Sequence, residues 1–343
     1  MHENHVTIDE INGQPTAIGA VLEELRGNEA IERVVSEAST FCFVGCGTSY
    51  FLSQSASALF NESVVSFAIP GSEAFLAPEQ LPSVSIDVIV PISRSGESTE
   101  TVRATEHLQE LHPDATVLGI TCTAGSAIHE LADVPVLSPE GAEEGVVMTK
   151  SFSSMLVALE YLSRVAAGDA SEWSAWDRLP TDSERVLESA DTIASEIGSQ
   201  TDVEKYVFLG SGAAYGLAAE AMLKLEEMTL MWTKAYHSLE FRHGPQSIAD
   251  ENTLVTFFLP DTNTEMHAAL VADVTELGSR TLVVGTGASL AQVDGDYEVE
   301  IPDRDLRSLS LSASTFQLLG YYRAVANGLD PDEPKNLSQV VTL

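Results

Sequence analysis

Basic residues are scarce in this sequence of 343 residues. Lys and Arg together number 17, only five of them lysines, whereas Asp and Glu number 52, which gives a formal net charge of −35. This balance argues against a nucleic-acid partner, because phosphate neutralisation needs a basic patch. The acidic residues form no run of five or six like charges, so they do not make a binding tail. We interpret them as adaptation to high salt, where the Debye length falls to about 3 Å at 1 M, and predict a halophilic source.

Cysteines and long apolar runs are scarce as well. The three cysteines, Cys42, Cys46 and Cys122, are an odd number without a close framework, which excludes a disulfide scaffold and predicts a reducing compartment. No apolar run approaches the roughly 20 residues of a membrane helix, and residues 1–10 lack the pattern of a signal peptide. We therefore expect a cytoplasmic protein without membrane contact. Its 44% of hydrophobic residues can bury a substantial core.

The most informative pattern that is present is an internal duplication. Residues 43–50 read Phe-Val-Gly-Cys-Gly-Thr-Ser-Tyr, and residues 208–215 read Phe-Leu-Gly-Ser-Gly-Ala-Ala-Tyr, at an offset of 165 residues. Further downstream, residues 116–119 (Thr-Val-Leu-Gly) correspond to residues 281–285 (Thr-Leu-Val-Val-Gly) at nearly the same spacing. Repetition in several registers indicates a tandem repeat of one domain.

Within each copy, short apolar runs alternate with small-residue turns and helical stretches. This alternation indicates βαβ units, and near-continuous apolar runs fit strands that helices cover on both faces. The predicted fold class is α/β, with two tandem domains that each contain a parallel five-stranded sheet flanked by helices. Right-handed crossovers gather the carboxyl ends of the strands at one edge, where we expect ligands to bind. In the first copy the predicted strands are residues 41–44, 64–69, 87–91, 115–121 and 134–137.

The two copies meet in a stretch around residues 166–180 that contains Gly, Asp, Ser and Trp. We predict an N-terminal domain of residues 1–172, with its core at about 28–165, and a C-terminal domain of residues 173–343, with its core at about 195–328 and a tail behind it. The predicted helices include residues 15–26, 101–111, 151–165, 181–197, 213–232 and 312–326.

A hydroxyl-rich loop follows the predicted strand 87–91. Residues 93–99 read Ser-Arg-Ser-Gly-Glu-Ser-Thr and precede a helix. Hydroxyls, a glycine and free N–H groups at a helix start form a cradle for an anion, and the guanidinium of Arg94 adds donors. An ordinary helix cap explains one or two of these hydroxyls, not four beside an arginine. The loop therefore predicts a phosphate site in the first copy, whereas residues 260–265 of the second copy have acid in place of Arg and Gly.

A second candidate loop lies at the start of the duplicated motif. Its N–H groups and hydroxyls, from Cys46, Gly47, Thr48 and Ser49, face the same predicted edge. As a dinucleotide fingerprint the loop is weak, because Tyr50 stands where a third glycine belongs. No base is evident for Cys46 as a nucleophile, so we interpret it as a small buried thiol.

Charged side chains mark two stretches of the second copy. Glu220, Lys224 and Glu227 share one face of the predicted helix 213–232, and the periodicity leaves open whether this face is solvated or functional. Residues 236–245 combine two histidines with an acid and an arginine before a Gly-Pro turn; a lone histidine such as His243 usually makes a local hydrogen bond. Histidines spaced in this way do not form a zinc site, so no metal is predicted.

Taken in order, these stretches resemble the family of double sugar isomerase (SIS) domain proteins and are similar to the isomerase half of glutamine:fructose-6-phosphate amidotransferase. The resemblance begins at Glu10-Ile11 with Gln14-Pro15 and ends at residues 334–337, Pro-Lys-Asn-Leu. It implies that residues 145–152 lie along the sugar. It also implies that phosphate is held by Ser49, Ser93, Arg94, Ser95 and Ser98. The candidate substrate and phosphate-binding residues are Cys46, Gly47, Thr48, Ser49, Ser93, Arg94, Ser95, Ser98, Val146 and Met148.

The resemblance also implies catalytic roles. Glu227 matches the glutamate that moves a proton between C1 and C2 of the sugar, and His243 matches a histidine that opens the sugar ring from the neighbouring subunit. An obligate homodimer follows from that second role. We expect Lys224 or backbone donors to stabilise the charge that develops on the substrate oxygen. This chemistry needs no cofactor.

Two departures from the amidotransferase pattern narrow the expected activity. Met1 is followed by His2 and not by the nucleophilic cysteine of a glutaminase half, so we expect no such half. Gln339 occupies the position of the family's imine-forming lysine and is a candidate contact in the tail. Arg94, Met148 and residues 239–245 instead resemble the stand-alone aminosugar-6-phosphate deaminases and isomerases.

The leading hypothesis is an aminosugar-6-phosphate deaminase/isomerase, with glucosamine 6-phosphate as the first substrate. The alternatives within enzymes are a plain phosphosugar isomerase and a sugar-amine deglycase. The alternative from another class is a phosphosugar-sensing regulator, although no basic segment supplies its usual DNA-binding helix-turn-helix.

Overall fold

The protein is described by a computed structural model over residues 5–169, 173–302 and 309–341. The chain separates into two compact units. The N-terminal-sheet unit consists of residues 13–144, 150–180 and the chain from Ser338 onward, and the C-terminal-sheet unit consists of the chain up to Asn12, residues 145–149 and residues 181–337. The predicted boundary between residues 172 and 173 adjoins residues outside the described part and stays a prediction.

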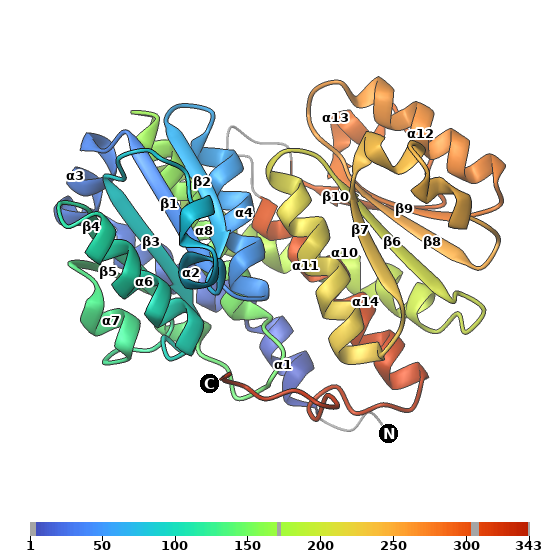
Figure 1. Ribbon diagram of the computed structural model, residues 1–343. Helices are drawn as coiled ribbons and strands as arrows, with labels where there is room; N and C mark the ends of the chain where they lie inside the picture. Colours follow the sequence, from blue (N-terminus) through green and yellow to red (C-terminus); the bar gives the residue numbers. More distant parts are fainter. Residues whose placement is uncertain (1–4, 170–172, 303–308, 342–343) are drawn as a thin grey trace. The chain divides into compact units, whose positions relative to one another are not determined.

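The N-terminal-sheet unit contains five parallel strands in the order β2-β1-β3-β4-β5 (Figure 1, blue to green). Each strand lies within a residue or two of its predicted run. The strands are β1 (Thr40–Gly45), β2 (Val65–Pro70), β3 (Val88–Ser93), β4 (Thr116–Thr121) and β5 (Val134–Leu137). The helices are α2 (Gln14–Leu25), α3 (Glu29–Glu37), α4 (Thr48–Phe60), α5 (Glu73–Leu76), α6 (Thr99–Leu111), α7 (Ala127–Leu131), α8 (Lys150–Ala166) and α9 (Trp173–Trp176), with 3-10 turns η1 (Pro78–Gln80) and η2 (Pro139–Gly141).

The C-terminal-sheet unit repeats this topology. Its parallel strands lie in the order β7-β6-β8-β9-β10, which matches the first sheet strand for strand (Figure 1, yellow to orange). The strands are β6 (Lys205–Gly210), β7 (Thr233–His237), β8 (Thr253–Phe258), β9 (Arg280–Thr286) and β10 (Tyr297–Ile301). The helices are α1 (Val6–Asn12), α10 (Leu179–Gly198), α11 (Ala213–Thr229), α12 (Thr264–Glu276), α13 (Gly287–Leu290) and α14 (Ala313–Ala326), with η3 (Ser238–Arg242), η4 (Pro245–Ile248) and η5 (Leu309–Ser312).

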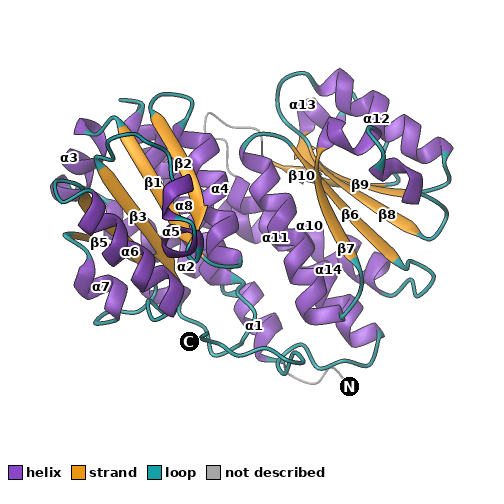
Figure 2. Ribbon diagram, in the orientation of Figure 1, coloured by secondary structure: helices purple, strands orange, loops and turns teal. Residues whose placement is uncertain are grey.

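The shared topology confirms the predicted fold class and the duplication. Helices pack on both faces of each sheet (Figure 2), and the central strands β3 and β8 are buried along their whole length. In each unit the strand order reverses direction between two adjacent strands, β1 and β3 in one, β6 and β8 in the other. Such a switch point opens a crevice at the carboxyl ends of the strands. Both predicted binding loops of the first copy, after β1 and after β3, lie at its switch point.

The Gly-x-Gly of the duplicated motif performs the same turn in both copies. Gly47 caps α4 at φ 54° and ψ −126°, and Gly212 caps α11 at φ 58° and ψ −130°, a region that favours glycine. The preceding glycines permit a close approach of backbone, since a Cβ on Gly45 would lie 2.6 Å from the Ser49 carbonyl and one on Gly210 would lie 2.1 Å from the Ala214 carbonyl oxygen. The strand-to-helix turn is thus fixed by sterics in both domains.

One predicted helix is shorter than expected. The predicted helix 213–232 is wrong at its C-terminal end, because α11 ends at Thr229 and Leu230 adopts a left-handed φ of 57°. The Thr229 hydroxyl donates to the Leu225 carbonyl and accepts from the Met231 N–H, so it competes with the helical pattern. Among the helices of the described residues, none is long and apolar enough to cross a bilayer.

The first helix, α1, belongs to the C-terminal-sheet unit and is held there by Asp332. The Asp332 carboxylate accepts hydrogen bonds from the N–H groups of Val6 and Thr7, both at 2.8 Å, and from the Thr7 hydroxyl at 2.6 Å. Partial burial raises the pKa of Asp332, but the hydrogen bonds from Thr7 and Val6 outweigh it and lower the pKa below its usual range. The negative carboxylate therefore fastens the N-terminus of α1 to the chain that follows α14.

We predict that Asp332→Asn lowers the free energy of unfolding at pH 7 by about 1–2 kcal/mol, because a neutral amide is a weaker acceptor for these donors. The carboxylate has a lowered pKa in the folded state, so its stabilisation is complete above the unfolded pKa of about 3.9 and disappears as the pH falls through the folded pKa. Urea unfolding across a pH series measures the difference. Asp9→Asn, on the exposed side of α1, is the control, and a difference that persists unchanged in acid contradicts the assignment.

Candidate active site

The predicted phosphate loop lies in the N-terminal-sheet unit, between β3 and α6. Ser93 ends β3 and is buried, and its hydroxyl accepts the Gly96 N–H at 3.0 Å. The Ser95 hydroxyl accepts the Glu97 N–H at 3.1 Å. Gly96 has φ 69°, and a Cβ there would lie 1.9 Å from the Ser126 hydroxyl oxygen. Two of the predicted hydroxyls therefore shape the turn, which a residue larger than glycine at position 96 would disrupt.

The loop after β1 adjoins the start of α6. Thr48 and Ser49 are buried in the first turn of α4, and the Thr101 hydroxyl donates to the Cys46 sulfur at 3.6 Å. The structure thus brings the two predicted loops together. Burial raises the pKa of the Cys46 thiol, which is further disfavoured as a thiolate by the charge of Glu100. A raised pKa is unsuited to a nucleophile, which agrees with the prediction against that role, but Cys46 is half-buried and not the fully buried thiol that the sequence predicted.

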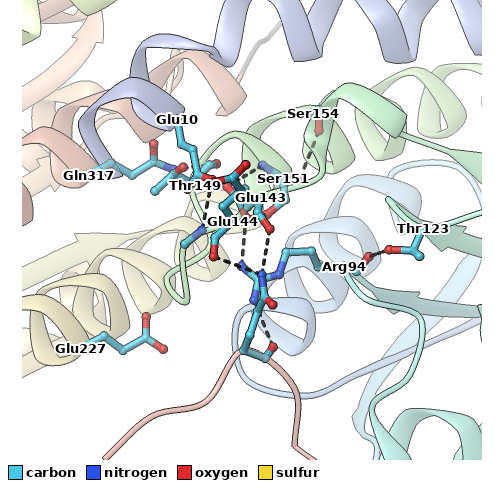
Figure 3. A network of polar contacts seen from close by, with 12 residues as sticks. Glu10, Arg94, Thr123, Glu143, Glu144, Thr149, Ser151, Ser154, Glu227 and Gln317 are labelled. Carbon is cyan, nitrogen blue, oxygen red and sulfur yellow. Dashed lines mark hydrogen bonds and ion pairs between the residues drawn. The ribbon is translucent and has the colours of Figure 1, made fainter. Parts of the chain in front are cut away.

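Arg94 is engaged by protein partners that the sequence did not reveal. Its guanidinium forms an ion pair with Glu143 at 3.1 Å, the two side chains being 9% and 0% exposed, and donates to the Gln339 carbonyl at 3.1 Å. Glu143 also accepts the N–H of Ser151 at 3.1 Å and its hydroxyl at 2.6 Å (Figure 3). A bound anion would therefore share Arg94 with Glu143.

The tail contact predicted at Gln339 has a defined geometry. The Gln339 side-chain amide donates to the carbonyls of Glu143 at 2.8 Å and Glu144 at 3.4 Å. A weaker backbone bond of 3.4 Å joins the Thr99 N–H to the Val341 carbonyl. The end of the chain is therefore fastened across the segment that precedes Gly145 and to the start of α6.

In the C-terminal-sheet unit, α11 carries a buried cation between two acids. Lys224 is 1% exposed; its ammonium lies 3.3 Å from Glu220, which is 0% exposed, and 2.5 Å from Glu227, which is 19% exposed. Burial lowers the pKa of Lys224, but the charges of Glu220 and Glu227 outweigh it and the net pKa lies above the ordinary value. The solvated-face alternative for this helix is wrong. Lys224 stays protonated and fixes Glu227 at the end of the row.

Glu227 opens onto a cavity of about 210 Å³ within the same unit. The walls come from the end of α11 and from the chain after α14. They consist of Glu227, Met228, Leu230, Gly328, Leu329, Asp330, Glu333, Pro334 and Lys335. Three carboxylates and one ammonium make the lining polar and charged. The predicted proton-transfer residue Glu227 thus lines a cavity, whereas Glu220 is not among the lining residues.

The predicted sugar-contact segment also belongs to this unit. Val147 is buried against Met228 and Ala324, with Leu329 packed beside them. Val146 and Met148 alternate with Val147 and are half-buried. The segment is thereby held against the last turn of α11, next to the residue that carries the candidate carboxylate.

His243 lies just after η3 with an exposed side chain, and its N–H donates to the Glu240 carbonyl at 3.0 Å. Among the described residues, no hydrogen bond or ion pair joins it to Glu227 or Lys224. Neighbouring Arg242 forms an ion pair with Asp273 at 2.6 Å. Searching the same described residues reveals no cluster of three His, Cys, Asp or Glu side chains that could hold a metal ion.

Sequence reasoning missed three contacts of the described residues: Glu143 pairs with Arg94, Gln317 donates to the Thr149 carbonyl at 3.1 Å, and Glu10 accepts the Gly145 N–H at 3.2 Å. The sequence did contain a signal for Glu10, because Glu10-Ile11 is part of the stretch that carries the family resemblance. Glu143 and Gln317 had none, since their partners lie far away in the sequence.

Comparisons with known proteins agree with this architecture. The model of the SIS domain matches residues 35–163 and 201–319, one segment in each half of the chain. The glutamine–fructose-6-phosphate aminotransferase of Methanothermobacter thermautotrophicus is 32% identical over 350 residues, which cover 99% of this chain and 58% of that protein. The chain thus spans less than two thirds of this curated relative.

Solved structures match over nearly the whole chain. The glucosamine-6-phosphate deaminase of Thermotoga maritima superposes with a TM-score of 0.83 at 28% identity, covering 98% of this chain and 100% of that one. The C-terminal domain of the glucosamine-fructose-6-phosphate aminotransferase of Francisella tularensis superposes with a TM-score of 0.85 at 24% identity, covering 97% and 99%, which supports the fold alone. With two matched segments and two sheets of one topology, the chain belongs to the SIS-domain family.

Proposed function

We propose that this protein is a phosphosugar isomerase-type enzyme that deaminates and isomerises an aminosugar 6-phosphate, with glucosamine 6-phosphate as the leading substrate. The observation that carries the proposal is the Lys224–Glu227 pair, in which a buried ammonium lies 2.5 Å from the carboxylate of a residue that lines a cavity. The likeness to a deaminase whose chain is matched over 100% of its length supports deamination.

The phosphate of the substrate is assigned to the loop after β3, with Ser49 from the loop after β1. Backbone N–H groups and hydroxyls at the start of a helix favour an anion. Arg94 would contribute part of its hydrogen-bonding capacity while it stays paired with Glu143. Binding of the phosphate contributes equally to the affinity for the substrate and for the transition state, and it holds the reacting carbons in place.

Glu227 is assigned as the base. It removes the proton from C2 of the open-chain amino sugar to give an enolamine and returns it to C1, which yields the imine of the ketose. Lys224, protonated between its two acids, orients Glu227 and opposes the negative charge that develops on the substrate oxygen. Addition of water to C2 of the imine and collapse of the carbinolamine then release ammonia and fructose 6-phosphate.

His243 is assigned to proton transfer during ring opening, in the site of a second subunit of a homodimer. Its exposed side chain, which lacks a described bond to Glu227, supports a role outside its own subunit's acid–base pair. Such sharing makes the dimer the active form.

Two related activities and one unrelated class compete with this proposal. A plain phosphosugar isomerase uses the same proton transfer without loss of nitrogen, and a deglycase acts on sugar-amine adducts. A phosphosugar sensor would keep the phosphate loop but has no use for a buried acid–base pair. The products formed from amino and neutral hexose 6-phosphates separate these alternatives.

We predict that Glu227→Gln lowers kcat for ammonia release from glucosamine 6-phosphate by about 10²–10⁴-fold, the usual worth of a general base, while leaving the affinity for the sugar phosphate within a few-fold. Coupled detection of ammonia and fructose 6-phosphate measures turnover, and calorimetry measures binding. The matched control is Glu226→Gln, one residue earlier on the same helix. A Glu227→Gln variant as fast as the parent would rule out the base assignment.

The shared histidine is tested by subunit complementation. We predict that His243→Ala and Glu227→Gln are each nearly inactive, and that mixing them with subunit exchange restores about a quarter of the parental activity, because half the dimers are mixed and each mixed dimer has one intact site. Size-exclusion chromatography confirms the exchange with tagged subunits. Absence of any recovery after verified exchange contradicts a site that is shared between subunits.

The halophilic interpretation gives a further expected result. With a net charge of −35, self-repulsion destabilises the folded state in dilute buffer and is screened at molar salt. The free energy of unfolding is expected to rise as KCl increases from about 0.1 M to about 2 M. Chemical denaturation in urea at each salt concentration measures it, and a stability maximum at low salt contradicts the interpretation.

Three free thiols fit a reducing, cytoplasmic location.

A further inference from the structure

The segment of residues 145–149 is fixed to the C-terminal-sheet unit at three points. Its centre, Val147, packs on Met228 and Ala324. Its end is held by Gln317 of α14, a side chain with 0% exposure, which donates to the Thr149 carbonyl at 3.1 Å (Figure 3). Its beginning is held by Glu10 of α1, whose carboxylate accepts the Gly145 N–H at 3.2 Å.

The contact between Glu10 and Gly145 is close as well as polar. Glu10 is 7% exposed, and a Cβ added to Gly145 would lie 2.7 Å from its second carboxylate oxygen. A side chain at position 145 would therefore displace the carboxylate or the segment. The absence of a Cβ and the presence of the carboxylate are matched to each other.

Glu10 is itself held in place by the helix that carries it. Asp332 fastens the first turn of α1 through Val6 and Thr7, and Glu10 lies one turn further along. The connection therefore runs from Asp332, through α1, to Gly145. Because Val147 then contacts Met228, the segment that Glu10 positions ends up beside the residue that follows Glu227.

We propose that Glu10 is a positioning residue of the active site, which sets the placement of Val146 and Met148 beside Glu227 through its bond to the Gly145 N–H. The inference rests on the proposed function for the role of Glu227 and deepens it. It makes α1 a part of the catalytic apparatus and gives a physical reason for Glu10 in the Glu-Ile element. A purely stabilising role would instead alter the folded fraction and leave the folded enzyme's kinetics unchanged.

The test compares three variants in the full-length chain. Glu10→Ala removes the acceptor, and we expect kcat/KM per folded molecule to fall about 10–100-fold, as for a small misplacement of reacting groups. Glu10→Gln keeps an acceptor oxygen of the same reach and is expected to stay within a few-fold of the parent. Asp9→Ala, the exposed neighbour on α1, is the control and leaves kcat and KM unchanged. Glu10→Ala with parental kcat and KM overturns the inference.

A second variant pair tests the coupling directly. Gly145→Ala is expected to lower kcat/KM strongly in the parent, where the added methyl meets the Glu10 carboxylate, and much less in the Glu10→Ala background, where that space is free. Strictly additive losses would contradict the proposed fit between the two positions.

A readout that needs no turnover separates this inference from the proposed function. In Glu10→Ala, the amides of residues 145–149 are expected to exchange with deuterium at least several-fold faster than in the parent, while those of β6 stay protected. Unchanged exchange in that segment overturns the positioning role whatever the enzyme catalyses. If Glu10→Ala differs from the parent in exchange as expected, but the parent has no activity on any hexosamine phosphate, the proposed function alone is overturned.

Discussion

The buried ammonium of Lys224 is the interaction on which the candidate site depends. Lys224 lies between a fully buried Glu220 and a partly exposed Glu227. Each of the two acids therefore depends on the same ammonium for its ion pair. Removal of one member of a buried ion pair costs about 3–5 kcal/mol, because the remaining charge is left uncompensated. Lys224 therefore neutralises the buried carboxylate of Glu220. It also holds the carboxylate of Glu227, which lines the cavity.

The same row distinguishes the two copies of the duplicated domain. At the offset of 165 residues, α4 of the first copy has Ser55 and Leu59 where α11 has Glu220 and Lys224. Conversely, the loop after β3 carries Arg94 and Gly96, whereas the equivalent loop of the second copy is acidic. Both copies keep the glycine turn that opens their switch point. The two copies thus share the scaffold but differ in their charged groups, with the candidate anion-binding residues in one sheet unit and the candidate proton-transfer residues in the other.

The contrast between what was predictable and what was not follows from the range of the interactions. Strands such as β3, and the turns at Gly47 and Gly212, could be read from the sequence, because burial on both faces and positive φ leave local signatures. The early end of α11 was missed because the hydrogen bonds of the Thr229 hydroxyl leave no periodic trace.

The sequence nominated candidate site residues but not their pairings. Arg94 is predicted as an anion ligand and stays a prediction, and its partner Glu143 lies 49 residues away and shows no pattern of its own. Likewise, residues 145–149 follow the first sheet in sequence and pack with the second. A segment of five residues is too short for hydrophobic periodicity to reveal which core it joins.

Three cations of this chain are buried, where salt screens them least. Lys224, Arg94 and Arg323 are all buried, and Arg323 donates to the carbonyls of Gln200 at 2.7 Å and Val203 at 3.1 Å. Exposed charges are screened over a few ångströms at molar salt, whereas buried pairs are screened much less. The acidic surface can therefore respond to salt while the pair of Lys224 and Glu227 keeps its strength.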